Sequence, residues 1–423
     1  MAPSESSQGG GTRHGTIVRG AEGMAPCRPM LTTALLLTLA TAPAPSLEMP
    51  VPLASPVALA PKVKEHGVDA IVLPLVSYNS DLGFTYGGVA GAYLYAPGHT
   101  PYRHAIAIQA LFTSRGQQNH YLRYDGPRLI GPLRLEMRLE YRRELRSPFY
   151  GAGNVSAQDF HGNESLERFN YTKGSPGAWV RLRGRPWGDN HPFQSYVGYG
   201  WRHTQVSPFD ASVLQDLKPV GYEGGATGQL TAGALWDTRD NESDPVRGGV
   251  EELSLRVSGS ATGSRYQYGG VTLSERRFWQ LGSRVVLAQR LTLDALFGEV
   301  PFFEWVNTGG VTFTEGIGGM SSVRGIERNR FAGNIKAFSN TEVRVRAFSF
   351  NLFGAPVYTG GVAFVDVGRV WHPDTVDGPW WKWHPGVGAG LRVARRAAVV
   401  RFDWAMSPET MRHRIYLNFG HMF

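Results

Sequence analysis

Residues 133–142 alternate apolar and charged side chains without a break, in the order Leu-Arg-Leu-Glu-Met-Arg-Leu-Glu-Tyr-Arg. A β-strand points successive side chains to opposite faces, so one face of this segment would be apolar and the other charged. A soluble, half-buried strand has the same period but seldom needs five consecutive charges on its second face. A strand between lipid and a polar lumen needs both faces, so the segment predicts a transmembrane β-barrel.

The same alternation recurs from residue 68 onward, in segments of roughly ten residues separated by turn residues. About sixteen segments have this pattern, and closure into a barrel would leave no unpaired sheet edge in hydrocarbon. The predicted fold is therefore all-β, an antiparallel barrel of about sixteen strands. The predicted strands are residues 71–78, 82–95, 102–113, 117–124, 132–145, 174–185, 193–205, 226–236, 249–259, 264–278, 284–296, 336–350, 357–367, 385–394, 397–406 and 412–423.

The N-terminus has the pattern of a secretory signal peptide. Arg28 precedes the apolar run 31–40, and small residues and prolines follow it. We predict that residues 1–46, an N-terminal extension and signal peptide, are removed on export. Residues 47–67 form a Pro/Ala-rich leader, and residues 68–423 form the barrel.

Several classes of function are disfavoured by the composition. The single cysteine, Cys27, lies within the signal, which excludes thiol chemistry from the mature chain. The net charge is +8, but the arginines are spread along strands rather than clustered, so no nucleic-acid partner is expected. Neither a Gly-x-Ser-x-Gly nor a His-Glu-x-x-His motif occurs, and no enzyme activity, cofactor or metal site is expected. A hydrolase using a membrane-facing Ser and His stays open as an alternative.

One long segment, residues 302–335, interrupts the strands between the eleventh and twelfth predicted positions. It is rich in glycine and charge, and a loop of this length in a compact fold is usually functional or disordered. It contains Val323-Arg324-Gly325, followed by Ile326.

This tripeptide resembles the conserved-loop motif of the BamA/TamA outer-membrane assembly and translocation family, also called the bacterial surface antigen family. In that family an aromatic residue follows the glycine, where this chain has Ile326. Further segments resemble family motifs in the same order, across roughly residues 82 to 423. They are residues 236–241, 244–248, 361–368, 388–392, 401–405 and 419–423.

The resemblance implies that the loop inserts into the barrel lumen and that its arginine pairs with an aspartate of a Phe-x-Asp-x-Gly strand. The matching residues here are Arg324 and Asp366, with Phe364 and Gly368 on the same strand face as the aspartate. An arginine is suited to two parallel hydrogen bonds with a carboxylate in such a place. The alternative partners, also predicted to face the lumen, are Glu342 and Asp403. The alternative to any such pair is that Arg324 is a loop arginine exposed to solvent.

The last predicted strand ends in an aromatic residue, Phe423, and places Leu417, Phe419 and Phe423 on the lipid face. By resemblance, a terminal aromatic is read by the barrel-assembly machinery, which would make this chain its client. The first and last strands would then meet at a weak seam.

The function implied by the resemblance is insertion or translocation of polypeptide, or of lipid, by a multi-pass protein of the bacterial outer membrane. The expected partners are outer-membrane lipid, the assembly machinery and exported or inserted polypeptides. The alternative is a passive pore or structural barrel. Family members usually carry periplasmic POTRA repeats before the barrel, and none is expected to fit before Leu82, which favours the alternative.

Overall fold

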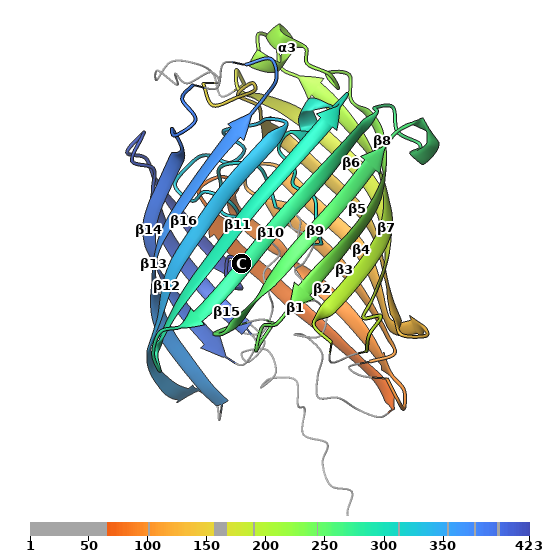
Figure 1. The fold of residues 1–423 in the computed structure, drawn as a ribbon, viewed down its shortest axis with the longest axis vertical. Coiled ribbons are helices and arrows are strands. Elements are labelled where there is room, and N and C mark those ends of the chain that lie inside the picture. Colours follow the sequence, from red (N-terminus) through yellow and green to blue (C-terminus); the bar gives the residue numbers. More distant parts are fainter. Residues whose placement is uncertain are drawn as a thin grey trace, which may run out of the picture. The chain divides into compact units, whose positions relative to one another are not determined.

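The computed structural model describes residues 66–99, 102–155, 167–188, 191–242, 244–311, 314–352, 355–375, 378–395 and 398–423. Within these residues, sixteen antiparallel strands form a barrel that β1 closes by pairing with β16 (Figure 1). The predicted fold class is confirmed, and every predicted strand overlaps an observed one. The predicted signal peptide and residues 47–65 of the predicted leader lie outside the described residues.

The strands in chain order are β1 Gly67–Asn79, β2 Gly83–Tyr95, β3 His104–Thr113, β4 Gln117–Ile130, β5 Leu133–Pro148, β6 Asn170–Gly184, β7 Phe193–Pro208, β8 Gly225–Asp237, β9 Gly248–Ser258, β10 Tyr268–Gln280, β11 Val285–Gly298, β12 Ile335–Leu352, β13 Ala355–Trp371, β14 His384–Arg395, β15 Ala398–Met406 and β16 His413–Phe419. The described helical turns are α3 Val213–Leu217, η2 Ser260–Thr262 and η3 Phe302–Glu304. In the described part of the chain, no helix is both long and apolar enough to span a bilayer.

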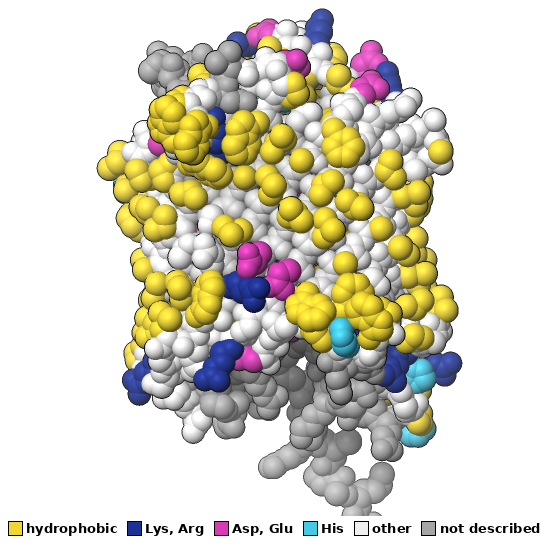
Figure 2. All heavy atoms as spheres, viewed as in Figure 1, with side chains coloured by type: hydrophobic (Ala, Val, Ile, Leu, Met, Phe, Trp, Pro, Cys, Tyr) yellow, Lys and Arg dark blue, Asp and Glu magenta, His cyan; other side chains and the backbone are white. Residues whose placement is uncertain are grey.

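The alternation in β5 separates an apolar outer face from a charged lumenal face. Met137 and Leu139 are exposed on the outer face, whereas Glu136, Arg138 and Glu140, which alternate with them, are buried. On the lumenal side, Glu136 pairs with Arg123 of β4 at 3.3 Å and with Arg181 of β6 at 3.8 Å. Apolar side chains cover much of the outer wall (Figure 2). The charges of β5 are thus satisfied across neighbouring strands inside the barrel.

The two ends of the barrel differ in the length of their connections. One end has short turns, such as residues 131–132 and 281–284, and the other has long connections, such as residues 209–224 and 299–334. Outer-membrane barrels have short turns toward the periplasm and long loops toward the exterior. By this rule the short-turn end of the barrel faces the periplasm.

The last strand is shorter than the sequence pattern predicts. β16 ends at Phe419, and Gly420 follows with a φ of +77°, a left-handed conformation that turns the chain. Phe423 therefore does not lie on the lipid face, and that part of the prediction is wrong. It lies against Phe278, a lumenal residue of β10, with ring centroids 6.4 Å apart. The Leu417 side chain lies on the exposed outer face.

The two-faced pattern makes the cost of a misplaced charge testable. Leu139→Arg places a cation on the lipid face near the middle of β5, and we expect it to lower the free energy of unfolding by about 2–4 kcal/mol. Urea unfolding in lipid vesicles measures the change. Leu145→Arg, three residues before the end of the same strand, should cost no more than about 1 kcal/mol. Equal costs at both positions would contradict the assigned membrane depth.

Candidate functional site in the β11–β12 loop and at the β1–β16 seam

The β11–β12 loop, residues 299–334, begins in a cluster of buried aromatic residues. Phe302 packs edge-on against Phe149 and Tyr171, with ring centroids 5.1 and 5.3 Å away. Phe303 packs against Tyr266 in the same way at 5.9 Å. Burial of several aromatic rings stabilises a contact strongly, so this cluster fixes the start of the loop to the long-loop end of the barrel.

The turn that carries Val323-Arg324-Gly325 is held by its own polar groups. The Ser322 hydroxyl accepts a hydrogen bond from Gly318 N at 3.0 Å and donates to Gly316 O at 2.5 Å. Gly325 has a φ of +90°, and a Cβ there would stand 2.6 Å from the Met406 carbonyl carbon. Only glycine fits both requirements, which explains its place directly after the arginine.

Val323 and Ile326 anchor the turn through apolar packing. Both are buried, together with Phe338 of β12 and Val370 of β13. A Cβ on Gly368 would approach Val323 to 2.8 Å, so this glycine makes room for the loop against β13. Ile326 therefore supplies packing at the position where family members have an aromatic residue.

Arg324 is fully buried and makes a two-pronged contact with Asp366 of β13. Its Nε donates to Asp366 Oδ2 at 2.8 Å, and its Nη2 donates to Oδ1 at 3.0 Å. The Arg324 backbone N–H also donates to Oδ2, at 3.1 Å. The guanidinium lies over the ring of Phe364, 3.4 Å from its centroid. The planar guanidinium is thus held by the Asp366 carboxylate and lies over the aromatic face of Phe364.

The two alternative partners contact the same guanidinium at the same time. Arg324 Nη1 donates to Glu342 of β12 at 2.8 Å and to Asp403 of β15 at 3.1 Å. We call Arg324, Phe364, Asp366, Glu342 and Asp403 the Arg324 cluster. One loop cation therefore joins three strands. Burial by itself would lower the pKa of Arg324, but Asp366 and Glu342 outweigh it and raise the pKa above its ordinary value.

The loop makes a second set of ion pairs that the sequence did not point to. Arg328 pairs with Glu315 of the loop at 2.9 Å and with Glu144 of β5 at 3.0 Å. Glu327 pairs with Arg412 and with Arg414 of β16, each at 2.7 Å. The loop thus contacts strands on both sides of the point where β1 meets β16. The sequence signal available for these ion pairs was the charged dipeptide Glu327-Arg328, which directly follows Ile326.

The seam between β1 and β16 is short. Only two residue pairs are in register among the described residues, Tyr78 with Leu417 and Asn79 with Tyr416, whereas β1 pairs with β2 along its full length. Ser80 adds a backbone hydrogen bond to Ile415 O at 3.0 Å. Among the described residues, the end of β16 after Leu417 is in register with β15 alone, where Phe419 faces Val400. Few backbone hydrogen bonds therefore hold the barrel closed here.

The loop lies behind this seam and contacts both of its strands. Met320 Sδ accepts a weak hydrogen bond from Asn79 Nδ2 of β1 at 3.8 Å and one from Asn418 Nδ2 of β16 at 3.5 Å. The Gly325 N–H donates to the Tyr416 hydroxyl at 3.2 Å. The Met320 side chain and the Gly325 backbone N–H therefore support the seam from the lumen.

The sequence pattern of the Omp85 superfamily domain matches residues 105–423, which include the loop, the Arg324 cluster and β16. The chain belongs to the Omp85 superfamily. The predicted family resemblance is confirmed, and an Omp85 barrel implies the bacterial outer membrane. A search of the curated proteins returns no match.

Solved barrels share the fold at low sequence identity. BamA from Haemophilus ducreyi, in a crystal structure lacking POTRA domains 1–3, is 15% identical with a TM-score of 0.60, over 84% of this chain and 71% of that chain. CdiB from Escherichia coli is 12% identical with a TM-score of 0.53, over 84% and 68%. CdiB from Acinetobacter baumannii is 14% identical with a TM-score of 0.50, over 84% and 65%. These likenesses show a shared fold.

In this Omp85 barrel the C-terminal tail occupies part of the lumen. The guanidinium groups of Arg290 and Arg344 each lie 5.2 Å from the centre of the Phe423 ring. His421 Nε2 lies 2.9 Å from Asp244 Oδ1, in the turn between β8 and β9. Phe423, predicted to face lipid, is therefore held by cations and by Phe278 inside the folded barrel.

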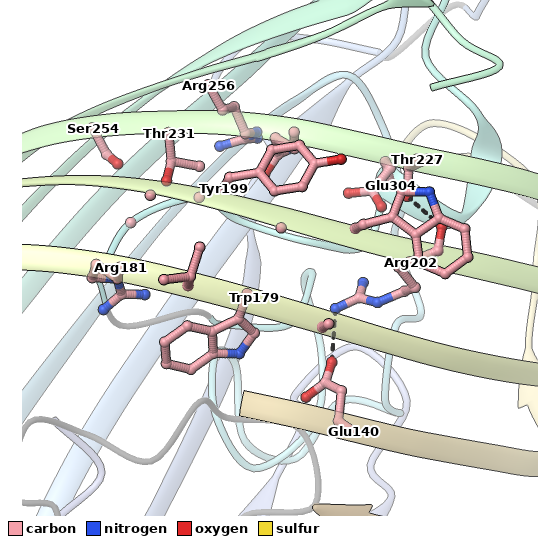
Figure 3. Close-up of a pocket in the computed structure, with 18 of the residues that line it drawn as sticks. Glu140, Trp179, Arg181, Tyr199, Arg202, Thr227, Thr231, Ser254, Arg256 and Glu304 are labelled. Carbon is pink, nitrogen blue, oxygen red and sulfur yellow. Dashed lines mark hydrogen bonds and ion pairs between the residues drawn. The ribbon is translucent and has the colours of Figure 1, made fainter. Parts of the chain in front are cut away.

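A polar cavity of about 150 Å³ lies between the start of the loop and the wall of the barrel (Figure 3). Glu140, Arg181, Arg202, Arg256 and Glu304 supply its charges. Arg202 pairs with Glu140 at 3.2 Å, and Arg256 pairs with Asp294 at 2.8 Å. The cavity suits water and small polar solutes. Among the residues that the structure describes, no three His, Cys, Asp or Glu side chains are grouped to hold a metal ion.

The Arg324 cluster predicts a large loss on removal of one carboxylate. Asp366→Ala should lower the free energy of unfolding by at least about 3 kcal/mol, because it leaves a buried cation with fewer partners. It should also open the loop to protease. Heat stability of the folded barrel and limited proteolysis measure both effects. Glu223→Ala, which breaks an exposed pair with Arg265, should cost no more than about 1 kcal/mol. Unchanged stability and cleavage in Asp366→Ala would mean that the cluster does not hold the loop.

The tail predicts a dependence of stability on pH. Burial, and next the charge of Arg344, lower the pKa of His421 to about 4, whereas the unfolded chain takes up a proton near pH 6.5. As pH falls through this window only the unfolded state gains the proton. The free energy of unfolding should therefore fall by up to about 3 kcal/mol between these values. His421→Asn should remove this part of the dependence, and parallel pH profiles for the two proteins would contradict it.

Proposed function

We propose that this Omp85 barrel acts in insertion or translocation of polypeptide, or of lipid, at the bacterial outer membrane, without catalytic chemistry of its own. The observation that carries the proposal is the seam, where β1 and β16 share two register pairs among the described residues. The resemblance of the motifs to the assembly and translocation family points the same way. The seam is the part of the wall that opens with the loss of the fewest backbone hydrogen bonds.

The seam edge of β1 has the chemistry to receive another strand. β1 runs from Gly67 to Asn79, but its pairs with β16 involve only Tyr78 and Asn79. Among the described residues, the recorded register between β16 and β1 begins only at Tyr78. A free strand edge is a template for addition of an extended polypeptide through main-chain hydrogen bonds. A polypeptide entering at this edge would pair with β1.

The β11–β12 loop is placed to keep the seam closed between such events. Its Met320 contacts both seam strands, while the Arg324 cluster fixes the same turn to β12, β13 and β15. Arg414 of β16 also pairs with Asp81, in the turn after β1, at 2.7 Å. Release of the loop would remove the lumenal support of the seam while leaving the other fifteen strand pairings intact.

A disulfide across the seam tests the proposal. Tyr78→Cys with Leu417→Cys places two cysteines directly opposite each other in register, within the reach of a disulfide. We expect the oxidised protein to lose activity and the reduced protein to regain it. The measurement is the outer-membrane proteome of cells in which this protein has been depleted and replaced by the variant.

Two controls separate the seam from the function. Leu122→Cys with Leu139→Cys forms a matched lock between β4 and β5, away from the seam, and should leave the proteome unchanged. If the seam lock also leaves it unchanged, opening at the seam is wrong. If depletion of the protein alters the level and location of no other outer-membrane protein, the assembly role itself is wrong. A large, steady single-channel conductance would then support the alternative, a passive pore.

A further inference from the structure

The lipid-facing wall of the barrel carries a patch of polar and charged side chains on β9 to β12. We call this the outer polar patch. Figure 2 shows acidic and basic side chains together on an otherwise largely apolar wall, in the region of β9 and β10. The members of the patch on the outward strand positions are Glu251, Glu275, Arg277, Gln289, Ser339 and Thr341.

The strand register shows that the patch lies inside the apolar band. Glu275 faces Glu251 on β9 and Leu291 on β11, and Arg277 faces Gln289 on β11. Toward the long loops, the next outward row is Leu253, Leu273 and Leu293. Toward the short turns, the next outward row is Trp279, Leu287 and Val343. Apolar rows on both sides mean that these charges are not simply the polar rim of the barrel.

The charges form one connected group with an excess of carboxylate. Arg277 Nε lies 2.9 Å from Glu275 Oε1, and Arg277 also pairs with Glu251. Two carboxylates and one guanidinium leave one negative charge unbalanced. Glu275 and Arg277 are 41% and 42% exposed, whereas the carboxylate oxygens of Glu251 are buried, so Glu275 is the carboxylate that an outside ligand reaches. A charge on the lipid face is destabilising in proportion to its depth, so this group needs an external partner.

An apolar groove of about 730 Å³ adjoins the charges. It is lined by Glu251 and Glu275 and runs across Leu253, Leu273 and Leu293 to β12. Trp236 borders it on β8, opposite Glu251 in register. The charges lie three to five residues from the short-turn end of β10, on the periplasmic side of the membrane by the loop-length rule. A headgroup at this depth and an acyl chain in the groove would fill the two parts of the site.

We propose that the outer polar patch binds a phospholipid with a primary-amine headgroup from the periplasmic leaflet. The ammonium group carries the positive charge and the hydrogen-bond donors that the unbalanced carboxylate needs. The phosphate of the same headgroup is suited to Arg277, and the groove is suited to one acyl chain. A second copy of this chain would bring another net negative charge to the patch, which disfavours self-association through it.

Lipid retention by the folded full chain tests the proposal. The protein is reconstituted in an equal mixture of phosphatidylethanolamine, phosphatidylcholine and phosphatidylglycerol with identical acyl chains, and bound lipids are counted by native mass spectrometry. The choline headgroup keeps the charge but has no N–H donor. We expect roughly a tenfold enrichment of phosphatidylethanolamine over phosphatidylcholine, as a charge-assisted hydrogen bond would give.

The triple variant Glu251→Gln, Arg277→Gln and Glu275→Gln should reduce this ratio to near one while the barrel still folds, because it removes charge from the lipid face. Its heat stability in phosphatidylcholine vesicles checks folding. The matched control, Glu223→Gln with Arg265→Gln, removes an exposed ion pair in the loops and should keep the enrichment. Equal retention of the three lipids, preference for phosphatidylglycerol, or an unchanged ratio in the triple variant would each overturn the proposal. A dimer that the triple variant dissociates would assign the patch to a second copy and overturn it also.

Discussion

The burial of one loop cation, Arg324, among three strand carboxylates is the interaction on which the arrangement of the lumen depends. Asp366, Glu342 and Asp403 belong to three different strands, and the guanidinium contacts all three. Glu342 also pairs with Arg344 and Asp403 with Arg392, so the loop cation completes a network of charges that the strands begin. Loss of the loop cation would leave these buried carboxylates with fewer partners, which is costly, so the loop and the wall stabilise each other. This reciprocity explains why a segment with little regular structure takes one defined position.

The barrel and the motif were predictable because both depend on local sequence. A two-residue period states which face each side chain occupies, and the five charges on one face of residues 133–142 favour a polar lumen over a soluble sheet. Asp366 was predicted as the partner of Arg324 from the family motif, with Glu342 and Asp403 as alternatives. The structure brings all three to one guanidinium. A sequence pattern names candidate partners, but it does not say how many converge on one donor group.

Other features depend on contacts between distant residues or on a single dihedral angle. The pair of Arg328 with Glu144 joins residues 184 positions apart, and no local pattern predicts it. The alternation of the last strand continued in sequence to Phe423, but Gly420 ends it in the structure. For the outer polar patch a signal was present. Adjacent charges at residues 251–252 and 275–277 cannot all face the lumen in a strand of period two.

The inward turn at Gly420 has a consequence for the length of the seam. Tyr78 faces Leu417 in an antiparallel pair, so a straight β16 would place Phe423 opposite Val72. The same four residues, 420–423, can therefore either lengthen the contact with β1 or pack beneath Arg290 and Arg344, but not both. Closure of the wall and filling of the lumen therefore require the same short peptide, residues 420–423. In this structure the peptide packs in the lumen.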